Sequence, residues 1–413
     1  MSETTALPRG GVSDSGPQRE PAGPGAVRRF PNARRAVRAA APAVAGYAAV
    51  RAVGLLLLWM HPGPGSALQR ITTLWDAVYY RDVALHGYSD DLGMPGYENG
   101  VPYSSRAFFP LYPALIRAVH EVLRLDPGGS ALLVTWTASL VAAAGIFALG
   151  SHLYGHRAGT VAAVLWGVLP HAVVESYAYS EALFTALAVW SLYAVVTRRW
   201  VWAGAISTLS CLTRPTGMAV AAAVVVAAAW CLVGHLRGRG GDVHWSRPLL
   251  GAVLAPLGWL GYVGYVGWAR GEWNGYFRVQ SAWDSHFDGG ITTARWLKAM
   301  LIGQGHRSTQ LDQVVMVLVV LAAVFLFAVT LVQRHPLPLL VFTATSLLIA
   351  LGNGAFYAPR ARFLVPAVTL LLPAAVGLAK ARSKLTLAAV LACAALASGM
   401  YGVFLTFRNP FSP

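Results

Sequence analysis

The chain has 413 residues, of which 56% are hydrophobic and only 12% are charged, and its formal net charge is +15. Soluble domains carry about 25% charged residues, so this composition excludes a soluble globular protein and indicates an integral membrane protein. The three cysteines lie within apolar runs, which excludes a disulfide framework or a Cys-X-X-Cys metal site.

The first segment of the chain is polar. Residues 1–37 are rich in Gly, Pro, Ala, Ser and Arg, which predicts a disordered basic cytoplasmic tail ahead of a membrane domain over 38–413. A spanning helix needs about 20 apolar residues, within a range of roughly 17–25. The expected fold is therefore all-α, with about eleven candidate transmembrane helices at 42–60, 131–150, 158–174, 181–197, 201–213, 216–234, 249–269, 313–332, 337–352, 363–379 and 385–406.

Basic residues orient these helices. With a cytoplasmic amino terminus, eleven crossings place on the cytoplasmic face the short loops that contain Arg198/Arg199, Arg237/Arg239 and Lys380/Arg382/Lys384. This bias follows the positive-inside rule, so it accounts for the net charge without nucleic-acid binding. Two long loops, 61–130 and 270–312, are then expected on the non-cytoplasmic face of the cell membrane, where thirteen of the 17 carboxylates also fall.

The first long loop is predicted to contain two amphipathic helices that lie along the membrane surface. One covers 71–87 and ends at Gly87, and the other passes through Arg117 and His120. Between them, residues 89–105 are rich in Gly, Pro and Asp, which is typical of a loop.

Asp76 lies in the first of these helices and is the candidate general base. Aromatic residues that suit a sugar ring surround it in sequence: Trp75, Tyr79, Tyr80 and Tyr88. The alternative is a structural carboxylate at a helix amino terminus, or one paired with Arg70 or Arg81. Taken alone, Asp76 slightly favours the structural interpretation.

Further acids flank the segment from Ser176 to Ser180, between two predicted helices. Glu181 is favoured by the dipole at a helix amino terminus, and with Tyr179 it is also a candidate contact for the acceptor or the sugar. His171 and Glu175 are four residues apart, but no third ligand is spaced with them, so we expect no metal site.

Three arginines are predicted close to the outer membrane plane: Arg214, Arg360 and Arg362. Each could simply anchor its helix at the interface. Together they suit an anionic lipid headgroup, since guanidinium groups pair with phosphate in a bidentate manner.

In the second long loop, aromatic and polar residues alternate around Gln280 and Trp283. This pattern fits an interfacial aromatic belt or a lid over a saccharide site, and composition does not choose between them. The chain contains no Walker loop, no Gly-X-Gly-X-X-Gly after a strand and no Asp-X-Asp signature. A transferase of this kind would need a lipid-carried donor.

Six short motifs in order resemble those of the PIG-V-like mannosyltransferases, within the GT-C glycosyltransferases. They are Trp75-Asp76 through Tyr88, Phe108-Phe109-Pro110-Leu111-Tyr112-Pro113, Tyr179-Ser180-Glu181-Ala182-Leu183-Phe184, Leu212-Thr213-Arg214-Pro215-Thr216-Gly217, Tyr276 with Gln280 and Trp283, and Arg362-Phe363-Leu364 with Pro366. Tyr80-Arg81 and Phe363 depart from the family's pattern.

The resemblance implies a GT-C fold and a metal-independent, inverting transfer of mannose from polyprenyl-phosphate mannose, with no cofactor. It assigns Asp76 as the base, Glu181 as a second functional acid, and Arg214, Arg362 and Arg360 to the donor phosphate. The acceptor would be a glycolipid, a lipoglycan or a protein hydroxyl.

Two other classes of protein stay open: a lipid-linked saccharide flippase or other transporter, and a catalytically silent membrane subunit. Transporters place polar residues at the bilayer midplane, whereas the predicted spans here are nearly free of charge apart from Arg51. This distribution favours an enzyme.

Overall fold

The structure, a computed structural model, describes residues 33–61, 66–94, 96, 100–238, 244–302, 311–354 and 360–412. Within these residues the fold is all-helical and contains no β-strand, only an isolated antiparallel bridge between Phe287 and Asn353. Six helical segments are long and apolar enough to cross a membrane: α1 (Ala33–Met60), α5 (Pro127–Tyr154), α9 (Gly217–Leu236), α10 with α11 (Ser246–Leu254 and Leu257–Arg270), α14 (Leu311–Val332) and α18 (Lys384–Phe407). The chain is therefore a multi-pass membrane protein.

Shorter helices complete the bundle. The apolar ones are α6 (His156–Gly167), α7 (Glu181–Val196), α8 (Trp200–Cys211), α15 (Leu337–Gly352) and α17 (Leu372–Ala379). The others are α2 (Ala67–Thr73), α3 (Asp76–His86), η1 (Ser105–Ala107), α4 (Leu111–Leu123), η2 (Ala172–Glu175), α12 (Gly275–Ala282), α13 (Ile291–Leu301), α16 (Arg360–Leu364) and η3 (Val368–Leu371).

Local sequence explains where several helices begin. The Asp126 side chain accepts a hydrogen bond from the Gly129 amide, and Pro127 occupies the first turn of α5, a position where its missing N–H costs nothing. Ser383 caps α18 in the same way by accepting from the Thr386 amide.

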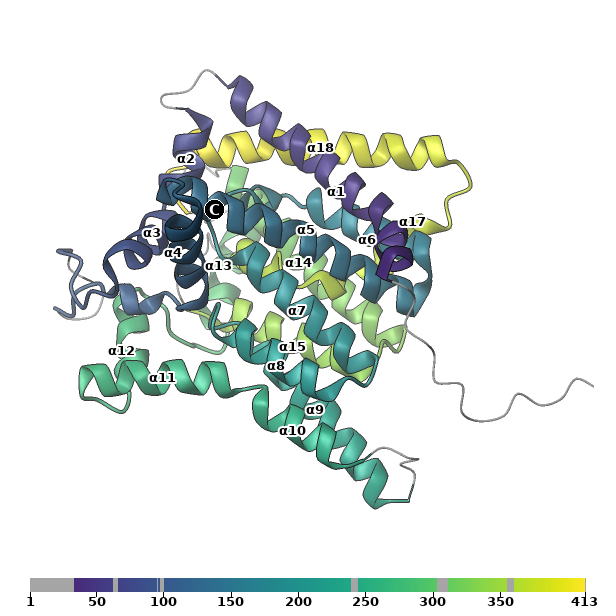
Figure 1. Cartoon of the computed structure of the whole chain (residues 1–413). Coiled ribbons are helices and arrows are strands. Elements are labelled where there is room, and N and C mark those ends of the chain that lie inside the picture. Colours follow the sequence, from purple (N-terminus) through teal and green to yellow (C-terminus); the bar gives the residue numbers. More distant parts are fainter. Residues whose placement is uncertain are drawn as a thin grey trace, which may run out of the picture.

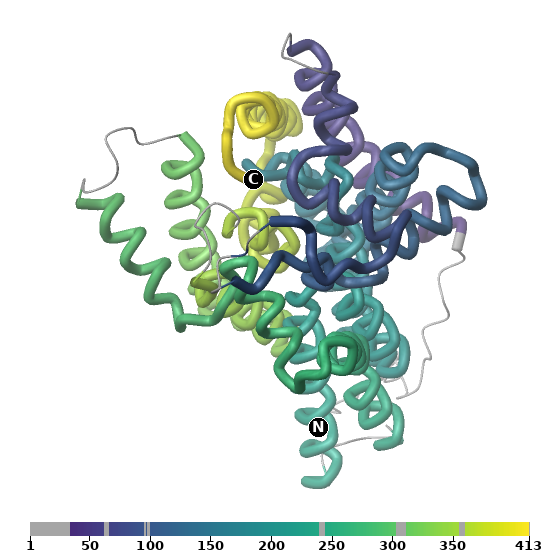
Figure 2. Tube along the Cα trace, turned by 90° about the vertical axis from the view of Figure 1, so that its left-hand side faces the viewer, coloured from purple at the N-terminus to yellow at the C-terminus, as the bar shows by residue number. Residues whose placement is uncertain are grey.

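The arrangement places the functional segments at one end of the bundle. α1 and α18 lie alongside each other at one edge, and α5, α6 and α7 form the centre (Figure 1). The interfacial elements α3, α4 and α12 gather at the same end, which faces the viewer in Figure 2. This end also contains the amino terminus of α7.

Four expectations need correction. α1 begins at Ala33, so residues 33–37 of the predicted tail are helical, and residues 1–32 lie outside the described part. The predicted span 158–174 is helical only as far as Gly167, where a turn begins. The predicted span 363–379 is divided among α16, η3 and α17. The predicted helix over 71–87 is split into α2 and α3.

Candidate active site

Two carboxylates and two arginines from four separate segments meet at this end of the bundle. Arg362 Nη2 donates to Asp76 Oδ2 at 2.8 Å, across 286 residues of sequence. Arg362 Nε lies 3.1 Å from Glu181 Oε1, and Arg214 Nη1 lies 2.7 Å from the same oxygen. Arg362 therefore links the two acids.

The two acids differ in exposure. The Asp76 side chain is 22% exposed, whereas the Glu181 side chain is completely buried. Neither contact of Glu181 has hydrogen-bond geometry, so within the described residues both of its carboxylate oxygens lack a hydrogen bond. A ligand that approaches from the surface can reach the partly exposed Asp76. Glu181 is buried, so it acts on a ligand only through the arginines that it contacts.

Each acid is the first residue of a helix, where the helix dipole favours negative charge. Asp76 begins α3 and Glu181 begins α7. Trp75, just before Asp76, has a φ of +52° and a ψ of −122°, a sparsely populated conformation that costs a non-glycine residue about 1–3 kcal/mol. This turn breaks the predicted single helix and sets Asp76 facing Arg362.

Hydroxyl and aromatic groups hold the arginines in place. Arg214 Nη1 donates to Ser180 Oγ at 3.0 Å, and the Ser180 hydroxyl is hydrogen-bonded to the Tyr80 hydroxyl at 2.7 Å. The Arg362 guanidinium lies 5.2 Å from the centre of the Tyr179 ring, close enough for a cation–π contact.

The electrostatics keep these groups in defined charge states. Burial alone lowers the pKa of Arg362, but the negative charges of Asp76 and Glu181 bring it above its usual value. Burial raises the pKa of Tyr79 and of Tyr80, and the Asp76 charge raises both further. The two phenols are therefore neutral at pH 7, and neither can act as the base there.

An aromatic wall borders Asp76 and joins the two long loops. Tyr79 stacks on Phe108 with ring centres 5.2 Å apart, and it meets Trp283 edge to face at 5.0 Å. Trp283 Nε1 donates to the Ser104 carbonyl. Farther out, Gln280 donates to the Ala107 carbonyl, and the Tyr88 hydroxyl donates to the Phe108 carbonyl.

The structure separates the predicted site residues into groups. Those in the charged cluster or directly against it are Asp76, Tyr79, Tyr80, Tyr179, Glu181, Arg214 and Arg362. Trp283, Gln280 and Tyr88 belong to the surrounding wall. Trp75 is 40% exposed.

Arg360 points elsewhere: its Nε donates to Thr293 Oγ1 and its Nη2 to the Asn353 carbonyl. The pairing of Asp76 with Arg70 or Arg81, which the sequence left open as an alternative, is not found among the described residues. Arg70 donates to the Thr406 carbonyl and Arg81 to the Thr72 carbonyl.

The prediction missed Ser180, Phe108 and Ser412. Ser180 and Phe108 stand inside motifs that had been recognised, so the motifs could have identified them. Ser412, whose hydroxyl accepts from Arg362 Nη1 at 3.2 Å, lies 50 residues away in sequence, and no pattern marks it.

A large apolar cavity of about 770 Å³ adjoins α16. Ala361 and Leu364, on either side of Arg362 in sequence, contribute to its wall, and α14 and α18 supply much of the rest. A cavity of this composition suits a hydrocarbon chain. Among the described residues, no group of three or more His, Cys, Asp or Glu could hold a metal ion.

One protein-family model matches part of the chain. The family model described as dolichyl-phosphate-mannose-protein mannosyltransferase matches residues 105–255, a region that contains Glu181 and Arg214 but neither Asp76 nor Arg362. A search of curated protein sequences found no match.

Solved structures of similar fold include proteins from Cupriavidus metallidurans and Archaeoglobus fulgidus. ArnT from Cupriavidus metallidurans in the apo state is 14% identical, with a TM-score of 0.50, and the match covers 88% of this chain and 75% of ArnT. ArnT bound to undecaprenyl phosphate is 15% identical, with a TM-score of 0.49, over 85% of this chain and 62% of that one. The archaeal oligosaccharyltransferase AglB from Archaeoglobus fulgidus, in complex with an inhibitory peptide and a dolichol-phosphate, is 12% identical, with a TM-score of 0.49, over 88% of this chain.

The chain spans 62% and 56% of the latter two structures. At these identities the similarity concerns the fold alone, and the apo ArnT structure supports a GT-C-like fold for this chain.

Proposed function

We propose that this protein is an inverting membrane glycosyltransferase that moves mannose from a polyprenyl-phosphate carrier to an acceptor hydroxyl on the non-cytoplasmic face. The observation that carries the proposal is the contact of Asp76 and Glu181 with Arg214 and Arg362 beside an apolar cavity. The family match over residues 105–255 supports a polyprenyl-type phosphate donor. The subfamily we propose is PIG-V-like, on the six sequence motifs.

The chemistry is a single displacement. The acceptor oxygen forms a bond to C1 of the sugar as the bond from C1 to the phosphate oxygen breaks, and Asp76 takes the hydroxyl proton. The leaving group is a polyprenyl phosphate, already acidic, so it needs cations rather than a proton donor. Arg362 and Arg214 supply that charge stabilisation in a site shielded from water.

Because Asp76 is paired with Arg362, binding of the donor is also expected to change how well Asp76 accepts a proton. Arg362 Nη2 lies 2.8 Å from Asp76 Oδ2, the proposed base. A donor phosphate competes for Arg362 and weakens its hold on Asp76, so the carboxylate becomes a better proton acceptor when the donor is bound. Donor binding would therefore precede activation of the acceptor.

The direct test is sugar transfer in membranes from cells with and without the protein. Membranes receive polyprenyl-phosphate mannose labelled in the sugar, and the labelled product is identified. A second set receives the same lipid with a different hexose, and a third contains EDTA. We expect transfer of mannose that persists in EDTA. Transfer of the other hexose alone would overturn the mannose assignment, and no transfer from either donor would overturn the function.

The aromatic wall gives a prediction about substrate binding. Trp283→Ala removes the ring that packs against Tyr79 and the hydrogen bond to Ser104. Aromatic pairs are worth about 0.5–1.5 kcal/mol beyond area burial, so we expect KM to rise about tenfold with a smaller change in kcat. Trp273→Ala is the control, because Trp273 in the same loop is 90% exposed. Equal KM values for the two variants would argue against a role for the wall in binding.

The proposed topology has eleven crossings, with the amino terminus in the cytoplasm. It predicts that Asp82→Cys and Lys384→Cys, each placed in a chain whose three native cysteines are replaced by alanine, lie on opposite sides of the membrane. A membrane-impermeant maleimide applied to intact cells should label position 82, and label position 384 only after permeabilisation. Labelling of both positions in intact cells would contradict the orientation.

A further inference from the structure

A second cavity, of about 560 Å³, lies at the opposite end of the bundle. α7 runs from Glu181 in the charged cluster to Val195 and Val196 in the wall of this cavity. Its 16 residues span about 24 Å at 1.5 Å per residue. This cavity is thus a separate site from the candidate active site.

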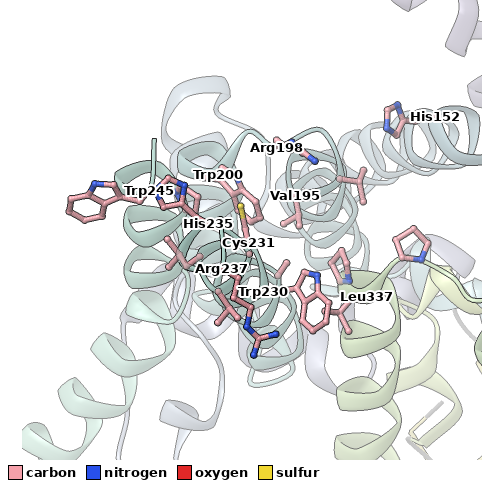
Figure 3. Close-up of a pocket in the computed structure, with 18 of the residues that line it drawn as sticks. His152, Val195, Arg198, Trp200, Trp230, Cys231, His235, Arg237, Trp245 and Leu337 are labelled. Atoms are coloured by element: carbon pink, nitrogen blue, oxygen red, sulfur yellow. The ribbon is translucent and has the colours of Figure 1, made fainter. Parts of the chain in front are cut away.

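Its lining combines tryptophans with basic side chains (Figure 3). The residues that characterise it are Trp200, Trp230, Trp245, Arg198, Arg237, His152 and His235. None of the described lining residues is acidic. Within the described part of the chain, neither Arg198 nor Arg237 makes a side-chain hydrogen bond or an ion pair. No acidic side chain among the described residues therefore pairs with the arginines at this cavity.

Trp200 carries a buried hydrogen-bond donor in the wall of this cavity that has no acceptor among the described residues. Its side chain is buried, with 6% of the residue exposed, yet its Nε1–H has no hydrogen-bond partner. An indole N–H can only donate, and a buried one usually finds a partner. The absent partner is thus an acceptor, and the neighbouring arginines favour an anionic one.

The outer wall of the cavity is formed by apolar side chains that are exposed on the surface of the bundle. Trp230 is 72% exposed and Val233 is 40% exposed on α9, and Leu337 at the start of α15 is 37% exposed. A soluble anion would leave this surface uncovered, whereas an acyl chain would cover it. Basic pockets between transmembrane helices bind anionic lipid headgroups for this reason.

We propose that this cavity is a binding site for an anionic glycerophospholipid. The lipid phosphate accepts from Trp200 Nε1 on the side of the cavity where Arg198 lies, Arg237 adds positive charge on the opposite side, and an acyl chain lies along the apolar wall formed by α9 and α15.

The test uses the full-length protein purified in detergent, with native mass spectrometry to count bound lipid and thermal unfolding to follow its effect. Phosphatidylglycerol, phosphatidylcholine and inorganic phosphate are added separately. We expect saturable binding and stabilisation with phosphatidylglycerol only. An equal response to phosphatidylcholine, or the same stabilisation with inorganic phosphate, would overturn the proposal.

Matched variants locate the effect. Trp200→Phe keeps an aromatic ring but removes the donor, and we expect affinity for phosphatidylglycerol to fall about tenfold, as for one hydrogen bond to a charged group. The control is Trp202→Phe, two positions along the same helix, where Trp202 is 65% exposed and does not line the cavity.

The double variant Arg198→Gln/Arg237→Gln changes only exposed side chains, so it tests the site even if Trp200→Phe does not fold. Arg247→Gln, on α10 outside the cavity lining, controls for loss of general surface charge. Equal losses of phosphatidylglycerol affinity in the variants and in their controls would overturn the proposal of a lipid site in this cavity. None of these measurements depends on sugar transfer, so the result is independent of the proposed enzymatic function.

Discussion

Asp76→Asn is expected to reduce the rate of mannose transfer by about 10²–10⁴-fold, the usual contribution of a general base. The asparagine keeps the shape of the side chain but cannot take the acceptor proton. Binding of the donor should be largely retained, because the proposal assigns the donor phosphate to Arg214 and Arg362. The measurement is kcat in the polyprenyl-phosphate mannose assay, with donor affinity followed separately by thermal stabilisation.

The matched control for this variant is Asp82→Asn, on the same helix. Asp82 is exposed on another face of α3, where it pairs with His86 at 2.9 Å. Its replacement should leave kcat within a factor of about two, since surface pairs contribute roughly 0–1 kcal/mol. If Asp76→Asn transfers mannose at the rate of the unaltered protein, Asp76 is not the base.

Arg362→Ala is expected to have the largest effect on stability and on donor affinity together. Its guanidinium is 6% exposed and lies against both Asp76 and Glu181. Removing Arg362 leaves two acids, Asp76 and Glu181, beside the single arginine Arg214, so the cluster keeps one negative charge without a partner. Breaking a buried ion pair in this way costs about 3–5 kcal/mol. The variant should unfold at lower temperature in detergent, and a polyprenyl phosphate should no longer stabilise it.

Two further variants separate charge burial from general damage. Adding Glu181→Gln to Arg362→Ala leaves one acid, Asp76, and one arginine, Arg214, so the cluster is again neutral overall, and part of the lost stability should return without donor affinity. Arg117→Ala breaks an exposed pair with Glu121 in which both side chains are more than half exposed, and should cost at most about 0.5 kcal/mol. A loss for Arg117→Ala as large as for Arg362→Ala would contradict the buried-pair argument.

Hydropathy predicted the long helices because a long apolar run has few alternatives in a bilayer. The segments 42–60, 131–150, 313–332 and 385–406 fall inside helices long enough to cross, and 216–234 does so except for its first residue, which caps α9. Hydropathy predicted the helix boundaries less well where an apolar segment contains a turn. The segments 158–174 and 363–379 are equally apolar, yet their backbones break into short helices and 3-10 turns, which a membrane protein tolerates where the backbone is buried in protein.

The motifs predicted most of the members of the candidate site but not their contacts. Arg360 and Arg362 are two residues apart and were given the same role. On a helix, two positions differ by about 200°, so one guanidinium faces Asp76 and the other faces Thr293. Sequence spacing predicted that both would lie near the site, but it could not say which of them faces inward.

The sequence by itself determined that this is a helical membrane protein and which residue types are available for chemistry, because hydrophobic length and charge are local properties. Only the tertiary structure decided that Asp76 pairs with Arg362 rather than with Arg70 or Arg81. The tertiary structure also decided that the Glu181 side chain is buried while the Asp76 side chain remains partly exposed. Those outcomes depend on contacts between segments up to 286 residues apart, whose geometry is fixed by how the helices pack and not by any spacing along the chain.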